Sequence, residues 1–110
     1  MSEEICEVII TAPDAEWLAN FAKDLVDRRL CAAAHNSAII RSIYRWKGDV
    51  YDEREARVAL HTRLSLVPSI VELTDTEHPY EVPCVVALPV VAGNPRYIQW
   101  VLDQTDGPQR

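Results

Sequence analysis

Glycine and cysteine are scarce in this chain of 110 residues, with three of each, and long apolar runs are missing. No glycine-rich loop is present that could cradle a phosphate group. Cysteine occurs only at Cys6, Cys31 and Cys84, without a Cys-x-x-Cys pair, so neither a disulfide framework nor a zinc knuckle is predicted. No apolar stretch approaches the roughly 20 residues that a membrane helix needs. We therefore expect no membrane span, and free cysteines that act as small buried apolar residues.

Basic residues are also few, with 11 Lys and Arg against 17 Asp and Glu and a net charge of −6. This balance argues against binding to nucleic acid or to anionic lipid, because both depend on Lys and Arg. The N-terminal residues Met-Ser-Glu-Glu have the wrong charge for a signal peptide, which predicts a cytoplasmic protein. The length predicts one domain over residues 1–110, with a loose tail over 105–110.

The spacing of apolar residues predicts an α+β fold in the order β-α-β-β-α-β, with a C-terminal helix added. Such an order is typical of the ferredoxin-like arrangement. Asp14, Ser65 and Asn94 are the expected N-caps of the three helices, and His78-Pro79 should end the second. The expected strands are 5–11, 32–46, 49–64 and 82–91, and the expected helices start at about residues 15, 65 and 95.

The two central strands form an unusually long hairpin, for which two registers are open. A two-residue loop of Lys47-Gly48 sets Arg41 opposite Arg54, whereas a three-residue loop with a bulge at Gly48 sets Arg41 opposite Glu53. We prefer the second register because it gives one coherent apolar face. That face gathers Ala34, Ala38, Ile40, Tyr44, Ala56, Val58 and Leu60.

The other face of this hairpin is mixed, and in a ferredoxin-like subunit the helices would leave it uncovered. Isoleucines and a tyrosine on an uncovered face favour a partner, and self-association is the simplest one. The residues expected on this face are His35, Ile39, Arg41, Ile43, Tyr51, Glu55, Arg57, Ala59 and His61.

Five short motifs occur in order along nearly the whole chain, and together they resemble the CutA family of divalent-cation-tolerance proteins. They are Thr11-Ala-Pro-Asp14, Ser42-Ile-Tyr-Arg-Trp-Lys-Gly48, His78-Pro-Tyr-Glu-Val-Pro83, Ala87-Leu-Pro-Val90 and Tyr97-Ile-Gln-Trp100. The resemblance implies a ferredoxin-like subunit, a homotrimer of PII-like architecture, and binding of copper or another divalent metal ion. It implies no catalytic activity and no organic cofactor.

The sequence departs from the family pattern at several positions. Ile10 and Cys84 stand where some members have Cys and Glu, and His61-Thr62 stands where Lys-Thr is usual. The thiol after the first helix has moved to Cys31. His78 is thus the one metal-ligand candidate that matches the family directly.

Copper and zinc favour imidazole and thiolate ligands, which makes His78 and Cys84 the candidate metal ligands. These residues are six positions apart, so a site requires the segment to bend or a neighbouring subunit to add a donor. A surface imidazole at a helix end and a buried thiol are the alternative interpretations. His35 and His61 form a second, weaker imidazole pair on adjacent strands.

Two functions follow from these observations. The first is a trimeric protein of divalent cation tolerance that binds metal at His78 and Cys84. The second is a metal-independent trimeric scaffold or sensor that binds a small molecule or protein in clefts between subunits. No Gly-x-Ser-x-Gly motif or Cys-His arrangement supports an enzyme.

Overall fold

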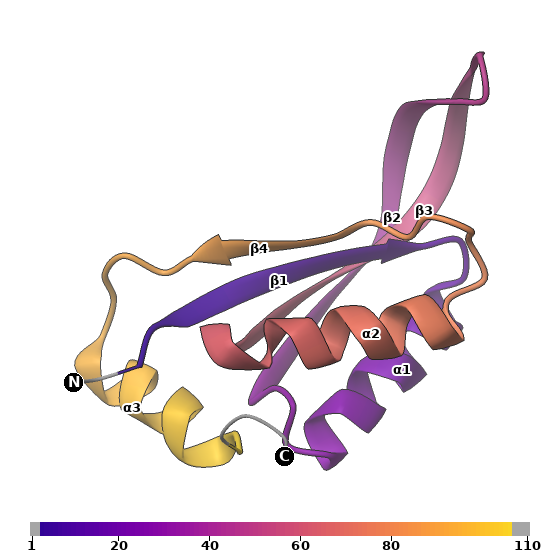
Figure 1. The fold of residues 1–110 in the computed structure, drawn as a ribbon. Helices are drawn as coiled ribbons and strands as arrows, with labels where there is room; N and C mark the ends of the chain where they lie inside the picture. The colour runs from indigo at the N-terminus through magenta and orange to yellow at the C-terminus, as the bar shows by residue number, and fades with distance from the viewer. Residues whose placement is uncertain (1–2, 107–110) are drawn as a thin grey trace.

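The computed structural model describes residues 3–106 and has one four-stranded antiparallel sheet and three α-helices. The strand order is β2-β3-β1-β4, and α1 and α2 lie side by side against the sheet (Figure 1). The predicted α+β class and order of elements are confirmed. The elements are β1 (Ile5–Ala12), α1 (Ala15–Asp27), β2 (Ala33–Trp46), β3 (Asp49–Arg63), a 3-10 turn (Leu64–Leu66), α2 (Val67–Glu77), β4 (Val85–Pro89) and α3 (Pro95–Gln104).

The main core lies between this sheet and the helices α1 and α2. Successive strand residues point to opposite faces, and on β1 the even-numbered residues Cys6, Val8 and Ile10 are fully buried under the helices. The helix α1 contributes Leu18 and Leu25 from its apolar stripe. In the described part of the chain, no helix is long and apolar enough to cross a membrane.

Two of the three predicted N-caps are confirmed. Asp14 Oδ1 accepts hydrogen bonds from the backbone N–H groups of Glu16 and Trp17, and Asn94 caps α3. The prediction for Ser65 is wrong, because a 3-10 turn precedes α2 and its N-cap has no side-chain bond. Ser65 instead donates its hydroxyl to Glu3, so it connects the chain's N-terminal segment to the end of β3.

The fourth strand is shorter than the predicted span of 82–91, since β4 covers only Val85–Pro89. Pro83 has no N–H to donate to a neighbouring strand, which explains the late start. The expected loose tail does not begin at Thr105: its side chain is buried, and it accepts a hydrogen bond from Arg63. Asp106 pairs with Arg29, while residues 107–110 lie outside the described part.

The long hairpin combines both registers that the sequence left open. From Ala33 to Ala38 the pairing follows the preferred register, with Ala38 opposite Ala56. A bulge between Ala38 and Ile40 then shifts β2 by one residue, so that Arg41 lies opposite Arg54 and Lys47-Gly48 forms a two-residue turn. The preferred register is therefore wrong for the outer half of the hairpin, which extends beyond the helices in Figure 1.

This bulge also changes which residues share a face. Directly opposed residues lie on the same face of a sheet, so Ile40 and Tyr44 lie with Glu55 and Tyr51 and not with Ala56 as expected. In the inner half the expectation holds. There the mixed face carries His35, Ser37, Arg57, Ala59 and His61.

The helix α3 packs against residues of this second face at one end of the sheet. Ile5 forms a small cluster with Val101 and Leu102. The Arg63 guanidinium reinforces the docking by donating to the Leu102 carbonyl and to Glu3. Burial raises the pKa of Glu3, but hydrogen bonds from Ser65 and Arg63 outweigh it and hold that pKa below its usual value.

Candidate functional site

His78, the first predicted metal ligand, lies at the C-terminal end of α2. Its backbone is extended because Pro79 disfavours a helical residue before it. This conformation carries the ring inward, where its edge packs against Trp17 with ring centroids 5.2 Å apart. The residue is 7% exposed, so the interpretation as a surface imidazole is wrong.

Both ring nitrogens of His78 have hydrogen-bond partners within the chain. The Tyr80 backbone N–H donates to Nδ1 over 3.0 Å. A neutral imidazole with an accepting Nδ1 carries its proton on Nε2, and Nε2 donates to the Thr11 carbonyl over 2.8 Å. The ring thereby joins the end of α2 to the end of β1, and neither nitrogen is open to a metal ion in this arrangement.

Tyr80 extends the same network to the sheet. Its hydroxyl donates to Glu55 Oε2 over 2.7 Å, and Glu55 is 4% exposed. Burial raises the pKa of Tyr80, and the hydrogen bond and negative charge of Glu55 raise it further. The phenol therefore stays neutral, and it satisfies a carboxylate that would otherwise be costly to bury.

Cys84, the second predicted ligand, is exposed in the segment before β4, which contradicts the alternative of a buried thiol. Cys6 and Cys31 are buried, as expected. Across residues 3–106, no three His, Cys, Asp or Glu side chains are placed to hold a metal ion. One chain as it stands thus does not fit a metal at His78 and Cys84, and their ligand role stays a prediction.

The second predicted pair, His35 and His61, is brought together. Their ring centroids are 5.1 Å apart in an edge-to-face arrangement. His61 Nδ1 lies 2.5 Å from the Tyr97 hydroxyl, and its Nε2 lies 3.4 Å from Glu7 Oε1. Sequence reasoning missed Glu7 and Tyr97 because they come from β1 and α3. Only the pairing of Glu7 with His61 across the sheet reveals the first of them.

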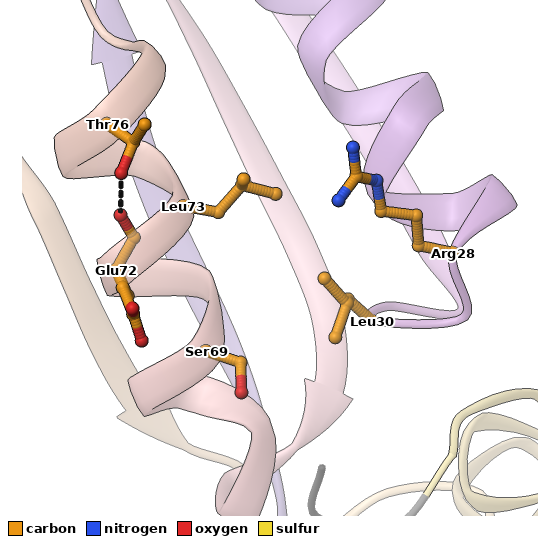
Figure 2. A pocket seen from close by; sticks show the side chains of 6 residues that line it. All are labelled: Arg28, Leu30, Ser69, Glu72, Leu73 and Thr76. Carbon is orange, nitrogen blue, oxygen red and sulfur yellow. Dashed lines mark hydrogen bonds between the residues drawn. The ribbon is translucent and has the colours of Figure 1, made fainter. Parts of the chain in front are cut away.

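A shallow groove of about 590 Å³ runs between α1 and α2, and sequence reasoning gave no signal for it. Figure 2 shows Leu30 and Leu73 facing each other across it. Its Thr76 hydroxyl donates to the Glu72 carbonyl, and Arg28 pairs with Asp24. Two of the polar groups that line the groove, the Thr76 hydroxyl and the Arg28 guanidinium, are thus already bonded within the chain.

Comparison with known proteins gives consistent matches over most of the chain. Residues 6–104 match the family model "CutA1 divalent ion tolerance protein". The "Divalent-cation tolerance protein CutA" of Thermus thermophilus is 38% identical over 98 residues, which cover 89% of this chain and 95% of that protein. "Protein CutA" of mouse is 37% identical over 102 residues, 93% of this chain, but the chain spans only 58% of its length.

Solved structures agree with this match. The crystal structure of CutA1 from Oryza sativa superposes with a TM-score of 0.91 at 30% identity and covers 96% of both chains. The described fold, with one antiparallel sheet and three helices, is thus the fold of CutA1 structures. The family model and the Thermus thermophilus relative are named for divalent ion or cation tolerance and not for a catalytic activity.

The names of related proteins contradict the expected cytoplasmic location. A relative from Arabidopsis thaliana, 33% identical, is named chloroplastic. An Archaeoglobus fulgidus protein of the same fold, with a TM-score of 0.88 at 24% identity, is named periplasmic. The expectation was wrong because it rested on the charge of four N-terminal residues, which does not fix the compartment in which such a chain works.

Proposed function

Because this chain belongs to the CutA1 family of divalent ion tolerance proteins, we propose that it binds divalent cations, copper among them, as a homotrimer and so contributes to divalent cation tolerance. The observation that carries this proposal is the match over residues 6–104, together with coverage of 95% of a Thermus thermophilus protein named for that function.

The sheet supports the trimeric part of this proposal. Its strand order suits a ferredoxin-like subunit of a PII-like trimer, and β2 is a free edge of the sheet. On the face turned away from α1 and α2, Val86 and Leu88 are each 51% exposed beside Ile9 and Ala59. Contiguous apolar side chains of this kind favour a partner, and in the proposal that partner is a second copy of the chain.

Charge and ligand chemistry support the metal-binding part. A net charge of −6 per chain becomes −18 in a trimer, and such a field concentrates cations. The exposed Cys84 thiol is a soft ligand suited to copper or zinc. His78 can join it only if its ring gives up the bond to Tyr80 or to Thr11, and a neighbouring subunit would have to add further donors.

Isothermal titration of Cu²⁺ and Zn²⁺ into the full chain tests the proposal. Wild type, Cys84→Ser and His78→Gln are compared, with circular dichroism as a check that each variant folds. Saturable binding by wild type is expected, with weaker binding in Cys84→Ser. A wild-type chain that binds neither ion would overturn the metal-binding function.

The metal-independent scaffold is the second candidate, and the enclosed network around His78 favours it. That network uses both imidazole nitrogens and the buried Glu55 for bonds within the chain, so in this arrangement these groups hold the structure together and do not bind a metal ion. A wild-type chain that forms a stable trimer but binds neither Cu²⁺ nor Zn²⁺ in the titration would favour the scaffold function.

A further inference from the structure

Two histidines lie together on the sheet face turned away from α1 and α2, which is the face that neighbouring subunits cover in the proposed trimer. We propose that His35 and His61 make this assembly sensitive to pH, so that protonation of both imidazoles weakens the trimer. The inference rests on the homotrimer of the proposed function and adds a regulation to it.

The pairing of the strands places both histidines beside the apolar residues of this face. Across the sheet, His61 lies opposite Glu7, and Glu7 lies opposite Leu88, which is 51% exposed. His35 lies opposite Ala59, so it is on the same face and is a diagonal neighbour of His61. The two ring centroids are 5.1 Å apart. A neighbouring subunit that covers Leu88 therefore also comes close to both imidazoles.

His61 has partners within the chain whether its ring is neutral or protonated. Its Nε2 lies 3.4 Å from Glu7 Oε1, and its Nδ1 lies 2.5 Å from the Tyr97 hydroxyl. That hydroxyl can donate to a neutral ring and accept from a protonated one. Burial and the charge of Glu7 raise the pKa of Tyr97, so the phenol stays neutral and the negative charge beside the ring is that of Glu7. The first proton on the histidine pair is thus matched by this carboxylate.

A second proton, on His35, adds charge beside cations. The diagonal neighbours of His35 on β3 are His61 and Arg57, since Arg57 lies opposite Ser37. Among residues 3–106, no Asp or Glu forms an ion pair with His35 or Arg57. Once both imidazoles are protonated, His35 carries a positive charge between two others. Covering it with a neighbouring subunit is then costly, because an unpaired cation loses its hydration.

The exposure of His35 in a single chain sets the direction of the pH effect. Separated subunits leave this ring in water, where it takes up the second proton more easily than in the trimer. Lowering the pH therefore favours separation, since the state that binds more protons gains stability as the pH falls. Imidazole side chains take up a proton near pH 6.5, whereas most carboxyl groups stay ionised down to about pH 5. The trimer should accordingly be more stable at about pH 7.5 than at about pH 5.5.

Dissociation of the full chain in urea, followed by multi-angle light scattering at these two pH values, tests the inference. At a fixed protein concentration, the urea series gives the dissociation constant of the trimer by extrapolation. For wild type we expect this constant to rise at least ~10-fold at the lower pH, because each proton taken up on separation contributes up to ~10-fold per pH unit. In His35→Gln, which cannot take up that proton, the rise should stay below ~3-fold.

Asn36→Gln is the matched control, because it changes an exposed side chain on the same strand and keeps both histidines. It should show the full rise of wild type. An equal rise in wild type and His35→Gln, or no rise in wild type, would overturn this inference and leave the homotrimer intact. A wild type that is monomeric at the higher pH without urea would overturn the homotrimer as well.

Discussion

The three histidines of this chain differ in how free their ring nitrogens are to bind a ligand. His78 is buried with both nitrogens bonded. His61 is partly exposed between Glu7 and Tyr97, and His35 is exposed. The histidine that the motif singles out is the one most tightly built into the protein.

The three cysteines also differ in exposure, and their reactivity toward a thiol reagent can test this difference. Burial raises the pKa of Cys6 to about 11, with a further contribution from the charge of Glu3, and burial raises that of Cys31 to about 12. The thiolate is the reactive form, so near pH 8 both should be almost inert while the exposed Cys84 reacts. Ellman's reagent should thus modify one thiol quickly in the native protein and three after denaturation.

The variant Cys84→Ser serves as the control for this assay. It should lose the fast reaction and keep the two slow ones. A native protein with two fast thiols would contradict the packing described for β1 or for the segment after α1, where Cys6 and Cys31 lie.

At the scale of the elements, the register of the long hairpin was predictable from the sequence in its inner half but not in its outer half. Apolar alternation correctly placed β2 and β3, and it gave the right register where Ala56 and Val58 are buried in the core. Beyond the bulge no core lies beneath the strands, so side-chain burial no longer selects the register. There the turn at Lys47-Gly48 decides it, and no glycine marks the bulge at Ile39.

The candidate site was less predictable than the fold for a related reason. Local signals such as the Asp14 cap and the helix end at Pro79 depend on neighbours in the sequence, and they were confirmed. The partners of His78 and His61 depend on tertiary contacts, since Thr11 lies 67 residues from His78 and Tyr97 lies 36 from His61.

The turn at the hairpin tip should be sensitive to its glycine. Gly48 has a φ of +89°, where a Cβ is strained although no atom lies within 4 Å of it. We expect Gly48→Ala to lower the free energy of unfolding by about 1 kcal/mol through the backbone alone. Urea denaturation at a fixed protein concentration measures this change.

Gly93 provides the matched control for that substitution. Its φ lies outside the left-handed range, and a Cβ there would meet Ile98 Cδ1 at an ordinary 3.7 Å. Gly93→Ala should therefore change the free energy of unfolding by less than about 0.5 kcal/mol. Equal losses in the two variants would indicate that backbone strain is not what makes Gly48 necessary.

At the scale of the whole molecule, the chain is more extended than its length requires. Its radius of gyration is 14.5 Å, against roughly 13 Å expected for a compact domain of this size. The hairpin accounts for the difference, because its outer half stands away from the helices in Figure 1. Ile39, Ile43 and Val50 are exposed along it. A single chain thus leaves apolar surface open both on this arm and on the sheet.

The proposed homotrimer makes that open surface an interface, which predicts how charge placed there should act. Val86 and Leu88 are on the face that neighbouring subunits would cover, opposite Ile9 and Glu7. A double substitution of Val86→Lys and Leu88→Lys would bury two ammonium groups in the interface, at a cost of several kcal/mol, because only the one at position 88 has a carboxylate, that of Glu7, opposite it. Multi-angle light scattering should give the mass of a trimer for wild type and a smaller mass for this variant.

The control is Val26→Lys in the last turn of α1, which is on the helical side of the sheet and where a cation is tolerated at a helix C-terminus. It adds one lysine, against two in the double variant, to a side chain that is also partly exposed. A mass equal to that of wild type would therefore assign the effect to the sheet face. A monomeric wild type at micromolar concentration, or a double variant that keeps the mass of a trimer, would contradict the assembly proposed for this face.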